Sequence, residues 1–536
     1  MIPNSKCAFL LLAMACTHMA STAQNTIIHD NDTWHEGYVN SLFNISYTSL
    51  NPTRLAHNAQ RDAGNAMVSY GLTRGCLHAI DAPQRVNDLN VYIGGLKHLG
   101  RIDLQGHLQY TNRSTRGQRW NATLFLHPDN PFILADSVAS DGNLETFQMQ
   151  AAMSYAFSPK LKGALQAALQ LGSASDQTDP RPKTNTSVFP ITAGIEYSAS
   201  KAWSLGASAE VRLLSSRMSY TVVNPLQSHR YFLMKGMGDY FRRSTSDESG
   251  YQRDYKGTTL TASVQAIYAP KGSTWQNFTE LRYANGYENA TDGGSAYTFK
   301  GGDFKRSGFE LTNRWMYSAN EQWLHQAILQ ASLYNTKGYW YDQKKLTDTE
   351  HGNISYYEIL SKDLIHKGQK TSIELMYRID HLRQGQRDWH ATIAATLADT
   401  QLKHYCDDGL RQQKYTLLHL NANAGKAFSL GKGCLTANIE AGYTLPAANR
   451  TYATGSNVSG NDDITASYVA PQFEYVSASQ LRLGALADYT FPLNARTRLG
   501  VFAQAQSAMH SGAADYDATM KSGHRTTATL GVHIQF

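Results

Sequence analysis

The chain has 536 residues, a formal net charge of +6 and a mean hydropathy of −0.43, and charged residues make up only 17% of it. It holds no apolar run near the roughly 20 residues that a transmembrane helix needs, which excludes a helical membrane protein. The mild basic balance argues neither for nor against nucleic acid, and we expect no nucleic-acid partner.

Residues 1–23 are predicted to be a signal peptide. Lys6 supplies a positive start, residues 8–15 form a short apolar stretch, and residues 21–23 (STA) suit cleavage before Gln24. Lipoprotein processing at Cys16 is the alternative, and it is disfavoured because no tether rich in serine or glycine follows. The N-terminal segment at 24–63 shows little alternation and holds a turn at Asn51-Pro52. We predict a periplasmic or plug segment there, part of which enters the barrel.

From residue 64 to residue 536 the chain divides into strand-length units with period-two alternation. The clearest unit is 101–110 (RIDLQGHLQY), and similar units recur to the end of the chain. Units of about 9–13 residues suit the roughly 9–11 residues that cross a bilayer, whereas soluble strands average about 5–6. We therefore predict an all-β fold, a transmembrane antiparallel outer-membrane β-barrel, rather than a secreted sandwich.

Short and long connections alternate along this region, as in barrels with short periplasmic turns and long extracellular loops. Eight short turns, a first strand near 66–73 and a final strand predict about 18 strands, with a range of 14–20. Additional hairpins could lie within residues 335–369 and 466–478.

The final strand, residues 526–536 (TTATLGVHIQF), alternates to the last residue of the chain. Its pattern resembles the C-terminal insertion signal of bacterial outer-membrane barrels, with the signal positions at Thr529, Gly531, Ile534 and Phe536. An edge strand of a soluble sheet is the alternative. In a barrel this strand must pair with the first one.

Two loop motifs carry a family resemblance. Residues 116–137 (RGQRWNATLFLHPDNPFILADS) and 175–184 (SDQTDPRPKT) resemble motifs of a Bacteroidetes family of outer-membrane β-barrels of unknown function. This resemblance implies the fold and a place in the cell outer membrane, and it brings no substrate or catalytic residue. Residues 51–55 (NPTRL) also resemble the hatch motif of fatty-acid transport channels, from which Thr53 and Arg54 depart.

The 116–137 loop is the best candidate site, because its aromatic and proline content predicts a packed loop. We expect a constriction folded into the lumen, and a ligand-binding lid is the alternative. The candidate residues, whose charged members could pair with one another, are Arg116, Arg119, Trp120, Asp129, Phe132 and Asp136.

Signals for chemistry are sparse. No nucleophile–base signature is visible, so we predict no enzyme and no cofactor. His107 and His533 are expected to be hydrated lumen residues. Residues 404–408 (HYCDD) gather metal-capable side chains, but ligands this close in sequence converge only at a sharp turn, and we predict no metal site. After cleavage Cys76, Cys406 and Cys434 remain, and we expect buried free thiols rather than a disulfide framework.

The lumen-facing charges are of both signs, which fits a wet channel or a braced wall and shows no single-sign ring. The leading hypothesis is a channel or accessory transporter for polar or small solutes. A plugged structural or surface-interaction barrel is the runner-up, and an outer-membrane hydrolase comes last. Expected partners are outer-membrane lipid and lipopolysaccharide, the barrel-assembly machinery and a partner in an uptake system.

Overall fold

The computed structural model describes residues 44–59, 62–224, 229–245, 251–293, 298–350, 352–383, 386–407, 409–453, 464–517 and 520–536. The predicted signal peptide, residues 1–23, and the first part of the N-terminal segment, residues 24–43, lie outside these ranges.

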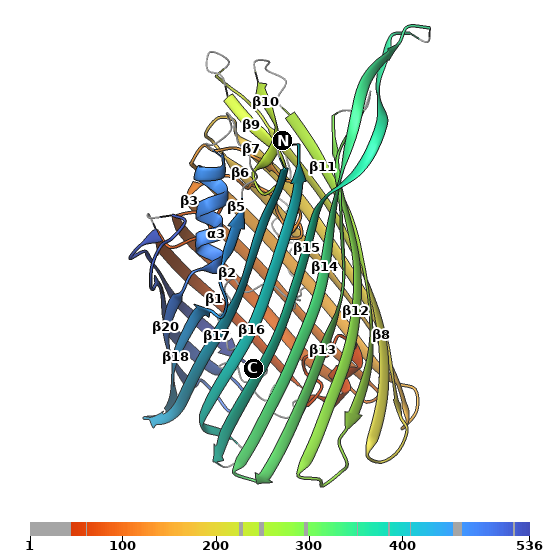
Figure 1. Ribbon diagram of the computed structural model, residues 1–536. Helices are drawn as coiled ribbons and strands as arrows, with labels where there is room; N and C mark the ends of the chain where they lie inside the picture. The colour runs from red at the N-terminus through yellow and green to blue at the C-terminus, as the bar shows by residue number, and fades with distance from the viewer. Residues whose placement is uncertain are drawn as a thin grey trace, which may run out of the picture.

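Eighteen antiparallel strands form a closed barrel in which each strand pairs with its neighbours along the chain (Figure 1). This confirms the predicted fold class and strand number. The wall strands are β1 (Ala63–Gly75), β2 (Arg85–Leu99), β3 (Ile102–Gln118), β5 (Ser140–Ala156), β6 (Leu161–Asp176), β7 (Pro182–Ser198), β8 (Trp203–Tyr220), β11 (Tyr251–Tyr268), β12 (Trp275–Asp292), β13 (Phe299–Asn320), β14 (Trp323–Asp348), β15 (Ile354–Arg383), β16 (Gln386–Cys406), β17 (Gly409–Leu430), β18 (Gly433–Pro446), β20 (Gln480–Pro492), β21 (Arg498–His510) and β22 (His524–Gln535).

The last strand closes the barrel. β22 pairs with β1 from Asn65 opposite Gln535 to Gly75 opposite Arg525. Beyond this ladder the Phe536 N–H donates to the Gly64 carbonyl at 2.9 Å, and the Gly64 N–H donates to the Phe536 carbonyl at 2.7 Å. Closure leaves no free strand edge, which is the condition for placing a sheet in hydrocarbon. The predicted pairing of the first and last strands is therefore confirmed.

Apolar side chains point outward from the wall, the reverse of a soluble protein. Ile439 and Leu530 are each 65% exposed, and many more large apolar residues on other strands are exposed. Outward aromatics meet in pairs at the short-turn end of the barrel, such as Trp203 with Tyr268, whose ring centroids lie 5.0 Å apart. An apolar outer belt bordered by aromatic rings is typical of transmembrane barrels.

The connections differ in length at the two ends, which we call the short-turn end and the long-loop end. Residues 335–369 do contain a hairpin, the possibility left open above, because β14 and β15 continue there as a two-stranded ribbon beyond the barrel (Figure 1). Residues 466–478 are helical rather than a hairpin, in η3 (Thr465–Val469) and α3 (Ala470–Ser477). A proline in the first turn of α3 suits a helix start.

The remaining elements are short. β4 (Leu134–Ala135), β9 (His229–Gly236) and β10 (Asp239–Thr245) form a separate three-stranded sheet, and β19 (Thr451–Ala453) pairs with β17. Near the start of the described chain lies the 3-10 helix η2 (Pro52–His57). Among the helices in the described ranges, none combines the length and apolarity required to span a bilayer.

Candidate functional site in the barrel lumen

The loop between β3 and β5, residues 119–139, is a packed structure. Trp120 is 2% exposed and Phe132 is 1% exposed. The Trp120 ring contacts Phe232 of β9 and Tyr468 of η3, with centroid distances of 5.8 and 5.0 Å. Leu134 of the loop pairs with β9. The 119–139 loop, the β9–β10 hairpin and the helical segment therefore pack together at the long-loop end.

Buried charges of the wall bind the backbone of this loop. Glu288 of β12 accepts from the His127 N–H at 3.1 Å and from the Asn130 side chain at 2.8 Å. On β11, Arg253 donates to the Phe132 carbonyl at 3.3 Å. These strands are more than 100 residues from the loop in sequence, so the loop reaches across the lumen.

Arg253 is itself fixed by a buried ion pair. Its guanidinium, 0% exposed, donates two hydrogen bonds to Asp292 of β12 at 2.5 and 2.7 Å. A bidentate arginine–carboxylate pair of this kind has a defined orientation as well as charge attraction. It holds the remaining guanidinium nitrogen against the loop.

The structure brings four of the six predicted candidates together in the loop: Trp120, Asp129, Phe132 and Asp136. Arg119 is half-buried at the base of the loop. Arg116 instead lies exposed on β3, with its guanidinium 3.6 Å from the Asp141 carboxylate. The expected pairing among the loop charges is wrong, because Asp129 pairs with Lys370 of β15 and Asp136 binds Tyr220.

Asp136 is a buried carboxyl with two donors. The Tyr220 hydroxyl donates to it at 2.9 Å and the Val138 N–H donates at 2.9 Å. Burial outweighs these donors and raises the pKa of Asp136 to about 6. The neutral acid is therefore favoured in the docked loop. Its contribution to docking is full below the ordinary pKa near 3.8 and is lost as pH rises through about 6.

At the short-turn end, residues 44–58 lie against inward-facing side chains. Asn51 caps η2 by accepting from the Thr53 N–H at 3.0 Å. The same side chain donates to the Ile195 carbonyl of β7 at 2.8 Å. A Cβ at Gly194 would lie 2.1 Å from the Asn51 amide oxygen, so only glycine admits this approach.

Charged residues of the wall anchor this 44–58 segment. Glu280 of β12 is 1% exposed and accepts from the Ser49 hydroxyl and the Leu50 N–H, each at 3.0 Å. Arg282 donates to the Thr48 carbonyl at 2.7 Å. The sequence pattern indicated that these wall charges face the lumen, but it could not identify their partners.

A second anchor holds the other end of the segment. Glu196 of β7 binds His57 at 2.8 Å and accepts from Thr53 at 3.2 Å. Apolar contacts add to these bonds, because Ile45 and Leu55 are buried in two clusters of wall residues. The segment is therefore fixed by several strands rather than by one.

Residues 404–407 of the metal-capable motif lie at the tip of the β16–β17 hairpin, and Asp408 lies outside the described residues. His404 and Cys406 gather with Asp239 of β10, their ligand atoms within 4.8 Å of one another. The sequence argument did not foresee this third, distant residue. However, the Asp239 carboxylate accepts from His404 at 3.0 Å and from Lys235 at 2.9 Å. The lysine already supplies the cation at this carboxylate, so we interpret the cluster as an ion-paired contact that fastens the β9–β10 hairpin to the wall.

Other predictions have mixed outcomes. His533 is not a hydrated lumen residue: it is 1% exposed and binds Asp488 at 2.9 Å. The described cysteines are free thiols, but none is buried as expected: Cys76 is exposed, and Cys406 and Cys434 are half-buried.

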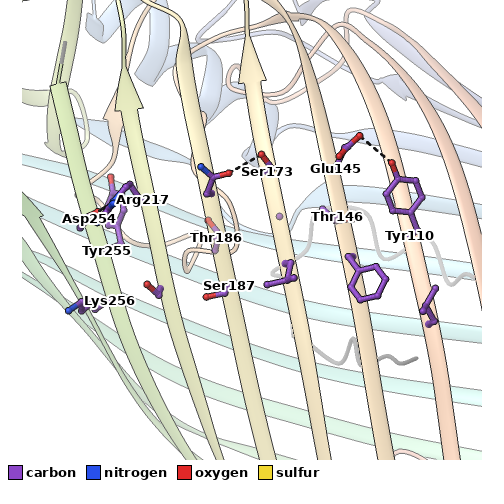
Figure 2. Close-up of a pocket in the computed structure, with 16 residues that line it drawn as sticks. Tyr110, Glu145, Thr146, Ser173, Thr186, Ser187, Arg217, Asp254, Tyr255 and Lys256 are labelled. Carbon is purple, nitrogen blue, oxygen red and sulfur yellow. Dashed lines mark hydrogen bonds and ion pairs between the residues drawn. The ribbon is translucent and has the colours of Figure 1, made fainter. Parts of the chain in front are cut away.

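The outer face of the wall carries a groove of about 1080 Å³ across β3, β5, β6, β7, β8 and β11 (Figure 2). Its upper rim is polar: Tyr110 donates to Glu145 at 3.2 Å, and Ser173 donates to Asn185 at 2.9 Å. Leu108, Phe147 and Leu171 supply its apolar part. Because these are outward positions, the groove faces the surroundings of the barrel and not its lumen.

Comparisons with known proteins assign no activity to this chain. The model of the Family of unknown function (DUF6850) matches residues 52–536. No curated protein matches the chain. Similar solved structures include the RagAB peptide importer in the closed-closed state, with 8% identity, a TM-score of 0.44, and coverage of 89% of this chain and 87% of that one. The copper transporter OprC has 9% identity, a TM-score of 0.39, and coverage of 89% and 82%. A Pseudomonas aeruginosa FadL homologue has 12% identity, a TM-score of 0.31, and coverage of 94% and 97%. At these scores the likenesses carry no argument, and the fold assignment rests on the strand register.

Proposed function

We propose that this chain, which belongs to the Family of unknown function (DUF6850), is a gated outer-membrane channel or accessory transporter for polar or small solutes. Membership in a family of unknown function agrees with the resemblance seen in the sequence. An origin in Bacteroidetes stays a prediction.

The outer-membrane location is supported by the closed sheet and its apolar outer belt. A barrel satisfies its backbone hydrogen bonds internally and turns apolar side chains to the lipid. In this reading the short-turn end faces the periplasm and the long-loop end faces the exterior. The barrel-assembly machinery and an uptake-system partner remain expected partners.

The observation that carries the gating proposal is the polar attachment of the 44–58 segment. Its contacts with Glu280, Arg282 and Glu196 are hydrogen bonds and ion pairs that water can replace when the segment leaves. A segment held permanently inside the barrel would be expected to bury a larger apolar surface. We therefore assign the segment as a plug at the periplasmic end and the 119–139 loop as the external constriction.

A lumen with these walls suits polar cargo. The charged residues that face it carry both signs: Glu280 and Arg314 are buried, and Arg282 is half-buried. Mixed charges attract polar solutes without strong preference for one sign of ion.

Conductance in planar bilayers tests the proposal. Four proteins are compared: the full mature chain, a chain lacking residues 24–58, a chain with residues 121–137 replaced by a short glycine–serine linker, and the double deletion. We expect few openings for the full chain and stable open channels for the double deletion. Heat-modifiable migration on gels verifies that each barrel is folded. A folded double deletion that stays silent would support the structural barrel and refute the channel.

A further inference from the structure

Four lysines form a row across the outer face of the wall near the long-loop end. Lys305 of β13 lies directly opposite Lys337 of β14, which lies opposite Lys367 of β15, which lies opposite Lys403 of β16. All four side chains are exposed. We call these four residues the lysine row.

Such a row is unfavourable by itself. Side chains directly opposite each other on antiparallel strands are close, and like charges at such positions destabilise the sheet. Within the described part of the chain, no carboxylate lies within ion-pair distance of these four ammonium groups. Tyrosine rings accompany two of them instead: Lys305 lies 5.6 Å from the Tyr339 centroid, and Lys367 lies 5.4 Å from that of Tyr405. An anion from outside the chain would relieve the repulsion between these ammonium groups.

On the same outer face, the side chains become less polar in successive rows from the lysine row toward the short-turn end. Two residues along each strand toward the short-turn end lies a row of hydroxyl and amide side chains, again directly opposite one another: Ser307, Asn335, Gln369 and Gln401. The next row is mixed, with Phe309 and Leu333 opposite each other and Thr371 opposite Asp399. One row further toward the short-turn end the face is apolar, with Leu311, Ala331, Ile373 and Leu397.

We propose that the lysine row binds the phosphate groups of a phosphorylated glycolipid in the outer leaflet. The apolar layer would meet the acyl chains, the hydroxyl and amide layer the sugar and ester oxygens, and the ammonium groups the phosphates. Strands about 4.8 Å apart spread four ammonium groups over roughly 15 Å, which gives room for more than one phosphate. Basic residues at a lipid surface add affinity for anionic headgroups. The proposal rests on the proposed outer-membrane location.

The test uses the full mature chain folded in detergent, with binding of a fluorescent bisphosphorylated glycolipid measured by titration. The variant is Lys337→Gln with Lys367→Gln, the two central members of the row. The matched control is Lys201→Gln with Lys271→Gln, two exposed lysines on the short turns. We expect the central pair to lose about tenfold or more in affinity, and the control to bind as the wild type does.

Two competing probes complete the design, namely the dephosphorylated glycolipid and soluble polyphosphate. Much weaker binding of both probes, with loss of phosphorylated glycolipid binding in the central variant, supports the proposal. Equal binding of the dephosphorylated lipid, equal binding of soluble polyphosphate, or an unchanged central variant would each overturn it. The assay requires no conductance, so a silent channel leaves this inference standing, and a binding failure leaves the channel proposal standing.

Discussion

Replacing Glu280 by alanine should release the 44–58 segment from the wall. This carboxylate accepts from two groups of the segment, the Ser49 hydroxyl and the Leu50 N–H, and from Gln265 and Arg282 of the wall. Its removal leaves these buried donors without their acceptor. Arg282 keeps a second carboxylate partner in the wall, because its guanidinium lies 3.7 Å from Glu310. The segment has no equivalent replacement at this point.

The magnitude follows from the two bonds that the segment makes. A hydrogen bond to a charged group contributes about 1.5–3 kcal/mol, so the two together contribute roughly 3–6 kcal/mol as an upper bound. Each 1.4 kcal/mol is a factor of ten, which raises the population of the released segment by about 10²–10⁴. The backbone pairing of β12 with β11 and β13 does not use the Glu280 side chain, so the barrel itself should stay folded.

Release is measured by maleimide labelling of Ser46→Cys, a position that is 2% exposed in the docked segment. The described native cysteines are first replaced by serine: Cys76, Cys406 and Cys434. The control is Glu440→Ala, which removes another lumen-facing carboxylate, one that binds Gln506. Labelling should accelerate strongly in the Glu280 variant and not in the control. Equal rates in the two variants would refute the assignment of Glu280 as an anchor.

Three further predictions concern the loop and the last strand. Asp136→Asn should raise the thermal unfolding midpoint relative to wild type. The difference should grow between about pH 4 and pH 6 and stay level at higher pH, where it corresponds to up to roughly 3 kcal/mol of stability. Circular dichroism melts measure this difference, and a difference that does not change with pH would contradict the prediction. Asp292→Asn should destabilise the barrel by about 3–5 kcal/mol because a buried arginine loses its partner. In the same melts Asp254→Asn, which breaks the exposed pair with Arg217, should leave stability nearly unchanged. Deleting Phe536 should reduce assembly in cells but leave refolding in detergent intact, whereas Phe428→Ala should affect neither; normal cellular assembly without Phe536 would refute its role as an insertion signal.

The strands of the wall could be predicted from the sequence because alternate residues of a transmembrane strand face different environments and therefore differ in polarity. Strict alternation in residues 101–110 and 526–536 reports lipid on one side and lumen on the other. Turn residues then divide the chain into strands, and sequential antiparallel pairing leaves only one way to close the sheet. The topology therefore required no information about long-range contacts.

The interior was harder to predict because its contacts join residues far apart in sequence. Composition indicated that the loop at 116–137 is packed, but the partners of Asp129 and Asp136 lie on β15 and β8. The partner of a charged loop residue depends on the path of the loop backbone over the wall. The alternation of polar and apolar residues contains no information about that path. The same reason explains why Asp239 was missing from the 404–408 motif.

The strands also overran their predicted ends for a physical reason. Apolar alternation stops where the lipid stops, but β14 and β15 continue to pair beyond that level and form the ribbon. Backbone hydrogen bonds need no apolar face, so pairing persists into water. Sequence periodicity consequently locates the membrane belt better than it locates the strand termini.

The 44–58 segment and the 119–139 loop bind the same strand, β12, through different residues. On β12, Glu280 binds the 44–58 segment and Glu288 binds the 119–139 loop, eight positions apart (280 to 288). Eight residues of strand span roughly 27 Å, and effects at sites this distant usually add. The strand between them is paired on both sides, so it offers no second arrangement through which one site could sense the other. If the 44–58 segment is a plug and the 119–139 loop a constriction, as we propose, we therefore expect them to act as independent gates in series. Their opening probabilities would then multiply, and a solute would pass only when a periplasmic event and an external event coincide.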